Sequence, residues 1–159
     1  MRYGPDFLLV HLLSLIRCHG GLALDAGSGR GRNGKYLAAQ GYRVVALDRF
    51  RPGSVAGDVR TLPHPSEIFD LVLCDSVLDT WSGQHELGVA ELKRVLKPRG
   101  HLFLVVAAAE GSDPAIAFTR EMVLRWVADL RLLELLYLRV DHPPMTGVRA
   151  QWALIARRP

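Results

Sequence analysis

The sequence contains little cysteine, little lysine and no long apolar run. Its two cysteines, Cys18 and Cys74, lie far apart and neither begins a CxxC pair, so we expect no disulfide framework and favour a reduced, cytoplasmic protein. The six histidines are scattered without the spacing of metal ligands, and we therefore predict no metal site. The apolar run at residues 7–16 has about half the length that a membrane-spanning helix needs. It predicts a first helix with Asp6 as its N-cap, and no membrane partner.

The composition indicates one globular domain. With 159 residues, of which 49% are apolar and 23% charged, the chain has the size and composition of a single folded unit. The formal net charge is +4, and among the 20 basic residues only Lys35, Lys93 and Lys97 are lysines. A mild basic excess is compatible with nucleic acid binding but more often serves solubility, so nucleic acid is not the favoured partner.

Apolar spacing, together with glycine and proline positions, predicts helices that alternate with short strands. The expected helices cover residues 7–17, 32–40, 84–97 and 113–136, and Pro98 and Gly100 would end the third. The expected strands cover residues 22–25, 43–48, 54–59, 69–75, 101–108, 135–141 and 151–158. We divide the single domain into an N-terminal helix at 1–21, a ligand-binding core at 22–110, and a C-terminal helix and hairpin at 111–159.

This alternation is typical of an α/β fold with a doubly wound, mostly parallel sheet. The last two strands are joined by a short loop, so we expect them to form an antiparallel hairpin. An acid falls at or just after four of the strand ends: Asp25, Asp48, Asp58 and Asp75. Because such sheets bind ligands at the carboxyl ends of their strands, the four acids predict a binding site along that edge.

The connection between the second and third strands is unusually short, with only the residues RFRPG between them. Parallel strands normally need a crossover of about a dozen residues or more. Either the third strand is degenerate, which would reduce a seven-stranded sheet to six, or one face of the sheet is open. An open apolar face would be covered by a second copy of the chain, so a homodimer is one expectation.

A glycine-rich turn, GSGRGRNG, follows the first expected strand. Gly29, Gly31 and Gly34 fit the G-x-G-x-x-G pattern of dinucleotide sites, with Asp48 as the following acid. One alternative is therefore a small nicotinamide-dependent oxidoreductase. However, the first of these glycines comes four residues after Asp25, too deep in the turn for that pattern. No G-K-[ST] follows, which excludes a P-loop.

Five motifs resemble those of the class I S-adenosylmethionine-dependent methyltransferases, in that family's order and spacing between residues 22 and 106. They are LDAGSGRG, RVVALD, GDVRTLP, FDLVLCDSVLDTW and ELKRVLKPRGHLFLV. The run GRGRNGKYLAAQGYRVVALD is similar to the small tellurite-resistance and thiopurine-type branch. The resemblance implies a Rossmann-like fold, with S-adenosyl-L-methionine as cofactor and S-adenosyl-L-homocysteine as product.

The resemblance also implies a role for each matching residue. The amino-acid end of the cofactor would be held by Asp25, Gly27, Ser28, Gly29 and Asn33. Asp48 would accept hydrogen bonds from both ribose hydroxyls. The adenine would be bordered by Arg49, Phe50, Asp58 and Val59. The methionine portion would lie beside Cys74, Asp75 and Ser76.

The resulting reaction would be methyl transfer to an unidentified small-molecule acceptor. A hydroxyl or a protonated amine needs a general base, for which the candidates are Asp75, Asp79 and His85. Three further residues would border the acceptor pocket: Trp81, Met145 and Thr146. Two more alternatives stay open, namely a module that binds the cofactor without chemistry and a methyltransferase that acts on RNA or protein. No N-P-P-Y motif follows the fourth strand, which disfavours methylation of an exocyclic base amine.

Overall fold

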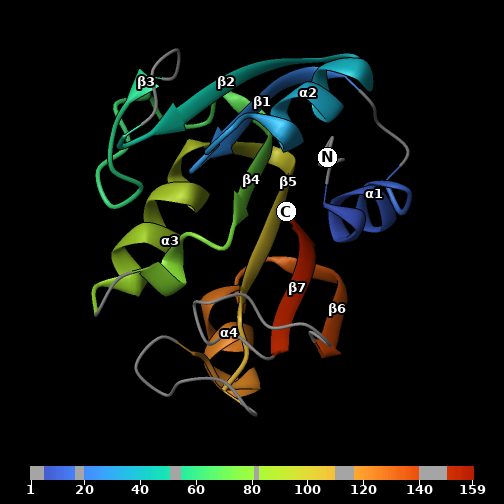
Figure 1. Cartoon of the computed structure of the whole chain (residues 1–159), viewed down its shortest axis with the longest axis vertical. Helices are drawn as coiled ribbons and strands as arrows, with labels where there is room; N and C mark the ends of the chain where they lie inside the picture. The colour runs from blue at the N-terminus through green and yellow to red at the C-terminus, as the bar shows by residue number, and fades with distance from the viewer. Residues whose placement is uncertain (1–5, 17–19, 51–54, 81–82, 110–116, 140–149) are drawn as a thin grey trace.

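The computed structural model describes residues 6–16, 20–50, 55–80, 83–109, 117–139 and 150–159. Its centre is a seven-stranded sheet in the order β3-β2-β1-β4-β5-β7-β6 (Figure 1). The strands are β1 (Gly21–Ala26), β2 (Tyr42–Asp48), β3 (Val55–Ala56), β4 (Phe69–Asp75), β5 (Leu96–Ala107), β6 (Arg131–Arg139) and β7 (Ala150–Arg157). The first five are parallel, and β7 is antiparallel to both β5 and β6. The predicted α/β class, mostly parallel sheet and antiparallel C-terminal pair are confirmed.

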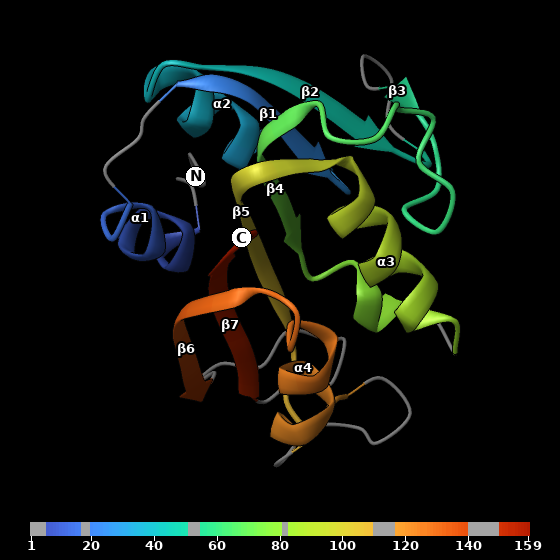
Figure 2. The ribbon, with the colours of Figure 1, turned by 180° about the vertical axis from the view of Figure 1, so that it is seen from behind.

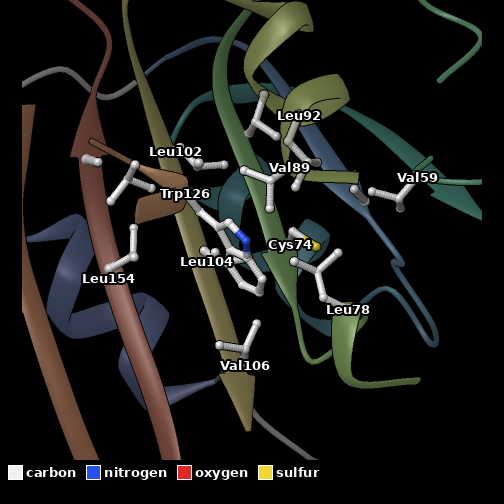
Figure 3. Close-up of a cluster of buried hydrophobic side chains, with 14 of the residues drawn as sticks. Val59, Cys74, Leu78, Val89, Leu92, Leu102, Leu104, Val106, Trp126 and Leu154 are labelled. Carbon is white, nitrogen blue, oxygen red and sulfur yellow. The ribbon is translucent and has the colours of Figure 1, made fainter. Parts of the chain in front are cut away.

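Helices cover both faces of the sheet (Figures 1 and 2). They are α1 (Phe7–Leu13), α2 (Arg32–Ala39), α3 (His85–Val95) and α4 (Arg120–Trp126), with a short 3-10 helix, η1, at Leu78–Thr80. α1 and α2 bury Leu12 and Leu37 in an apolar cluster on one face. α3 and α4 bury Val89 and Trp126 in a second cluster on the other face, and Figure 3 shows the Trp126 side chain in the middle of it. The sheet is therefore a layer between two apolar cores.

The short connection after β2 leads to a degenerate third strand. β3 has two residues, Val55 and Ala56, which pair in parallel with Leu47 and Asp48 at the end of β2. Both β3 residues are exposed. The sheet thus keeps seven strands, but its edge at β3 is minimal, which is how the chain manages without a long crossover.

The prediction of one long helix over residues 113–136 is wrong. α4 covers Arg120–Trp126 only, and the chain forms β6 from Arg131 onward. The segment 131–139 is rich in leucine, which suits a helix locally, but its backbone pairs with β7 along the whole length of β6. Tertiary pairing overrides local propensity here. The start signal around residue 113 lies outside the described residues.

The prediction that Pro98 and Gly100 end the third helix is also wrong. α3 ends at Val95, and Pro98 and Gly100 lie inside β5. The register between β4 and β5 is irregular there: Phe69 pairs with Leu96, whereas Leu71 pairs with His101. The additional β5 residues form a bulge, a position in a sheet where proline is tolerated.

The first helix begins where the sequence predicts. Asp6 caps it, because the N–H of Leu8 donates to Asp6 Oδ1 at 2.8 Å. The helix ends at Leu13, earlier than expected. Within the described ranges, no helix combines the length and the apolar character that crossing a membrane requires.

Candidate functional site

The glycine turn after β1 is fastened to the end of β2. The backbone N–H groups of Gly27 and Ser28 both donate to the carbonyl oxygen of Leu47, at 2.8 and 3.0 Å. Gly27 has a φ of +80°, and a Cβ there would lie 2.1 Å from Cγ2 of Val77, so no other residue fits. Gly29 also has a positive φ, of +52°, but a Cβ there would meet no atom closer than 4.0 Å. Space is therefore open above Gly29, on the outer side of the turn.

Two cavities meet at this turn. The larger, of about 690 Å³, is lined by the turn and the first residues of α2. The smaller, of about 480 Å³, extends along the end of β2 past Asp48 and Phe50. Both are lined by Gly27, Asp75 and Ser76. The cavities lie at the carboxyl ends of β1 and β4, where the strand order reverses, which is the usual ligand position in doubly wound sheets.

Asp48 joins the turn to the smaller cavity. Its Oδ2 accepts from the N–H of Gly29 at 2.9 Å, and its Oδ1 accepts from the N–H of Phe50 at 2.9 Å. An ionised carboxylate has about four acceptor positions, so lone pairs remain for a ligand. Beside it, the Phe50 ring is 82% exposed and the Arg49 guanidinium lies 5.5 Å from the ring centroid. The rim of this cavity thus carries an accessible aromatic face.

Asp75, at the end of β4, is held by a polar network. Its Oδ2 accepts from Nδ2 of Asn33 at 2.9 Å, and its Oδ1 accepts from the Ser76 hydroxyl at 2.9 Å. Asn33 also accepts from the N–H of Asp6 at 3.0 Å. Arg32 lies 3.4 Å from the Asp6 carboxylate and 3.6 Å from that of Asp75. The start of α1 is therefore tied directly to the wall of the larger cavity.

A model of the methyltransferase-domain family matches residues 24–104, about half of the chain. The chain belongs to this methyltransferase family. The predicted resemblance to class I S-adenosylmethionine-dependent methyltransferases is confirmed.

Curated relatives of this chain are longer proteins. Malonyl-[acyl-carrier protein] O-methyltransferase of Salmonella typhimurium is 30% identical over 105 residues, which are 58% of this chain and 41% of that protein. A probable methyltransferase of Arabidopsis thaliana is 30% identical over 120 residues, or 64% and 19% of the two chains. The chain therefore spans less than half the length of these relatives.

Solved structures share the fold of this chain. The 1,6-didemethyltoxoflavin-N1-methyltransferase of Burkholderia thailandensis, solved with 1,6-didemethyltoxoflavin and S-adenosylhomocysteine, has a TM-score of 0.77. It is 21% identical, over 96% of this chain and 77% of that one. TehB from Haemophilus influenzae has a TM-score of 0.77 at 17% identity, over 95% of this chain and 61% of that one.

Asp25 lies beneath the glycine turn and does not line either of the two cavities there. It is 2% exposed, and its Oδ2 has no hydrogen-bond partner among the described residues. Burial raises the pKa of Asp25 to about 6, and the backbone N–H of Gly34 opposes this shift. A direct contact between Asp25 and the cofactor stays a prediction, and the carboxylate is placed to support the turn from below.

Asp58 and Val59 differ in their access to the smaller cavity. Val59 lines it, whereas Asp58 does not. The Asp58 carboxylate accepts two side-chain hydrogen bonds from Arg60, at 3.0 and 2.6 Å, and lies 3.8 Å from Nε of Arg49. Hydrogen bonds from Arg60 lower the pKa of Asp58 to about 2. A role in reading the adenine amino group would use the lone pairs that Arg60 leaves free.

Cys74 and Ser76 lie on opposite sides of Asp75. The Cys74 thiol is fully buried in the apolar cluster under α3 (Figure 3), so only the backbone of this residue can face a ligand. Ser76 lines both cavities. Its φ of +55° is unusual for a residue other than glycine and marks a sharp turn directly after β4.

Of the three candidate bases, Asp75 alone lines the cavities at the turn. Asp79 lies in η1, is 8% exposed, and burial raises its pKa to about 6. His85, at the start of α3, packs its ring edge-on against Phe118 with centroids 4.7 Å apart. The catalytic assignments of all three remain predictions.

Several expected residues lie outside the described part of the chain: Trp81, Met145 and Thr146. Sequence reasoning missed Asp6 and Arg32, whose contacts with the site span more than twenty residues of chain. No local pattern signals such contacts. Among the described residues, no three histidine, cysteine, aspartate or glutamate side chains gather as metal ligands would.

Proposed function

We propose that this chain transfers a methyl group from S-adenosylmethionine to a small-molecule acceptor. The observation that carries the proposal is the meeting of two cavities at Gly27, Asp75 and Ser76, at the carboxyl edge of the sheet. One cavity has the features to hold a nucleoside, and the other leaves room beside Asp75 for a second molecule. Membership of the methyltransferase family supports this assignment.

The residues present fit the cofactor. The open space above Gly29 lets a ligand approach the backbone of the turn. Asp48 keeps acceptor positions for the ribose hydroxyls, and Phe50 offers an exposed ring for the adenine. Asp75 lines both cavities, and the methionine portion would lie beside it. When bound, S-adenosylmethionine supplies an electrophilic methyl group on a sulfonium.

The contribution of the chain to the reaction is chiefly positioning. Holding donor and acceptor in line replaces a bimolecular encounter by an intramolecular step. If the acceptor is a hydroxyl or a protonated amine, Asp75 is the candidate base with access to the cavities, and Asp79 is the buried alternative. The larger cavity also carries Arg30, Arg32 and Lys35, which favours an acceptor with negative charge.

A small acceptor is favoured over a macromolecule because the larger cavity has a volume of about 690 Å³, which suits a compact molecule. The Burkholderia thailandensis structure, with its bound 1,6-didemethyltoxoflavin, is a precedent on the same fold. A cytoplasmic location and a homodimer stay part of this proposal. Light scattering that finds a stable monomer at high protein concentration would remove the dimer.

Calorimetry with S-adenosylmethionine tests the cofactor assignment. Loss of hydrogen bonds to a charged acceptor costs about 1.5–3 kcal/mol, so we expect Asp48→Ala to weaken binding by at least about tenfold. Asp129→Asn is the matched control, because Asp129 is exposed and pairs with Lys93 away from the cavities. Equal affinities of wild type and Asp48→Ala would contradict the ribose role, and a wild type that does not bind would contradict the function.

Product formation separates an enzyme from a binding module. We expect S-adenosylhomocysteine to accumulate with at least one compound of a panel of anionic small molecules. Binding of the cofactor without turnover, on small molecules, RNA and protein alike, would leave a module without chemistry. Titration with NAD should give no heat, because the first glycine of the dinucleotide-like pattern, Gly29, comes four residues after Asp25 and is too deep in the turn for that pattern.

A further inference from the structure

Three basic side chains stand side by side at the amino ends of the parallel strands, the edge opposite the glycine turn. His101 of β5 pairs with Arg157 of β7, and Arg157 pairs with Arg131 of β6. Residues directly opposite one another in antiparallel strands point to the same face, with Cβ atoms about 4.5–5.5 Å apart. Since like charges in such positions repel, the Arg131–Arg157 pair is unfavourable unless an anion lies beside it.

The row belongs to the face of the sheet that carries α1 and α2 (Figure 2). Leu71, the β4 residue paired with His101, is buried in the apolar cluster on that face. Burial lowers the pKa of His101, and the charge of Arg157 lowers it further. The row therefore faces the region between the end of α1 and the sheet.

A cavity of about 660 Å³ lies over this row. Arg99, Arg131 and Arg157 line it together with His101. Its apolar wall comes from Leu15, Ile16, Tyr42 and Leu133. The cavity thus combines a strongly basic side with an apolar one, which is the character of a pocket for an amphipathic anion.

The nearby carboxylates are engaged elsewhere. Asp70 lines the cavity, but both its oxygens lie 3.0 Å from Nζ of Lys97, and Oδ2 also accepts from the N–H of Leu22. Glu134 of β6 lies 3.9 Å from His11 of α1. Within the described ranges, no carboxylate lies within 4.0 Å of the guanidinium groups of Arg131 and Arg157. The part of the chain that the structure describes thus offers no ion pair to these two guanidinium groups, and Arg157 Nε donates to the carbonyl oxygen of Arg99 at 3.3 Å.

We propose that this cavity is a second binding site, for a phosphate-bearing small molecule, separate from the site at the glycine turn. The planar guanidinium group matches phosphate oxygens in two-point contacts, and two arginines side by side suit a diphosphate or a nucleotide. The apolar wall with Tyr42 would receive the organic part of the ligand. β1, which separates the two edges, has six residues, or about 20 Å at 3.3 Å per residue.

Calorimetry with inorganic pyrophosphate and with ADP, at physiological salt, tests the proposal. We expect both to bind the wild type, ADP more tightly, and Arg131→Gln/Arg157→Gln to weaken both by at least tenfold. The control, Arg120→Gln/Arg125→Gln, removes the same charge from the exposed surface of α4, and we expect unchanged binding. No binding to the wild type at millimolar ligand, or equal weakening in the control, would overturn the proposal.

Two further measurements keep the test decisive. Removal of repelling charges should leave the double variant at least as heat-stable as the wild type without ligand. If the double variant does not fold, Arg131→Gln alone serves, because Arg131 is exposed.

S-adenosylmethionine should bind the wild type and the variants equally. Failure of the phosphate-site proposal would therefore leave the proposed methyl transfer unaffected. Binding of a single-stranded RNA oligonucleotide, with no binding of pyrophosphate or ADP, would replace the small ligand by a nucleic acid surface.

Discussion

The carboxylate of Asp25 lies against the backbone of Gly34: a Cβ at Gly34 would stand 3.0 Å from Asp25 Oδ2. Gly34 belongs to the first turn of α2, and Asp25 lies at the end of β1 beneath it. The glycine that completes a dinucleotide-like pattern in the sequence therefore makes room for a buried acid.

The first prediction concerns this contact. An alanine in a helix is normally better than glycine by about 1 kcal/mol, but Gly34→Ala forces its methyl group against Asp25 and Val44. We expect a net loss of about 1 kcal/mol in the free energy of unfolding, measured in urea. In an Asp25→Ala background the same change should be neutral or stabilising. An equal loss in both backgrounds would show that Asp25 is not the obstacle.

The second prediction concerns the link between α1 and the site. Asn33→Ala leaves the N–H of Asp6 without its acceptor and Asp75 Oδ2 without its amide donor. We expect the unfolding free energy to fall by about 1–2 kcal/mol and the affinity for S-adenosylmethionine to fall several-fold. Arg30→Ala, in the same cavity wall, is the control. If Arg30→Ala matches Asn33→Ala in both measurements, the network around Asp75 has no special role.

Much of the fold and of the site follows from local pattern. The acids Asp48 and Asp75 end apolar runs, and strands that end in this way bring both carboxylates to one edge of a parallel sheet. The two residues border the same cavity. The glycine-rich turn between β1 and α2 could also be predicted, because all of its residues are close together in the sequence.

Features that depend on contacts between distant parts of the chain could not be predicted from local sequence patterns. The leucines of β6 have a helix-like local sequence, and only β7 makes the segment a strand. The row formed by His101, Arg157 and Arg131 exists because three strands from different parts of the chain align in register. Asp58 and Arg60 are only two residues apart, so a local pattern could have predicted their ion pair. The spacing alone, however, does not say whether an acid binds an arginine or a ligand.

The third prediction separates two roles of Asp58. If its carboxylate binds the adenine amino group, Asp58→Asn should weaken S-adenosylmethionine binding by about tenfold, the value of one hydrogen bond to a charged group. Arg60→Gln keeps the carboxylate and removes its partner, so it should bind the cofactor as well as the wild type or better. Equal weakening by both variants in calorimetry would instead assign the pair a structural role at the cavity.

The fourth prediction concerns the pH dependence of stability without cofactor. Burial raises the pKa of Asp25 and of Asp79 to about 6, from an ordinary value of 3.8. Between about pH 4 and 6 the folded state therefore holds protons that the unfolded state has released, so the unfolding free energy falls as the pH rises through this window. The pKa of Asp58 is lowered to about 2. Its protonation therefore reduces the unfolding free energy only below about pH 4, outside this window.

Asp79→Asn isolates one of these two buried groups. A shift of this size corresponds to about 2–3 kcal/mol at full effect, so we expect the variant to be more stable than the wild type by up to that amount at pH 7.5 and equal to it at pH 4. The slope of the unfolding free energy between pH 4 and 6 should fall to about half, because Asp25 still titrates. Asp129→Asn, at an exposed position, should leave the slope unchanged. A wild-type slope in Asp79→Asn would mean that this carboxyl is already ionised in the folded protein at pH 4.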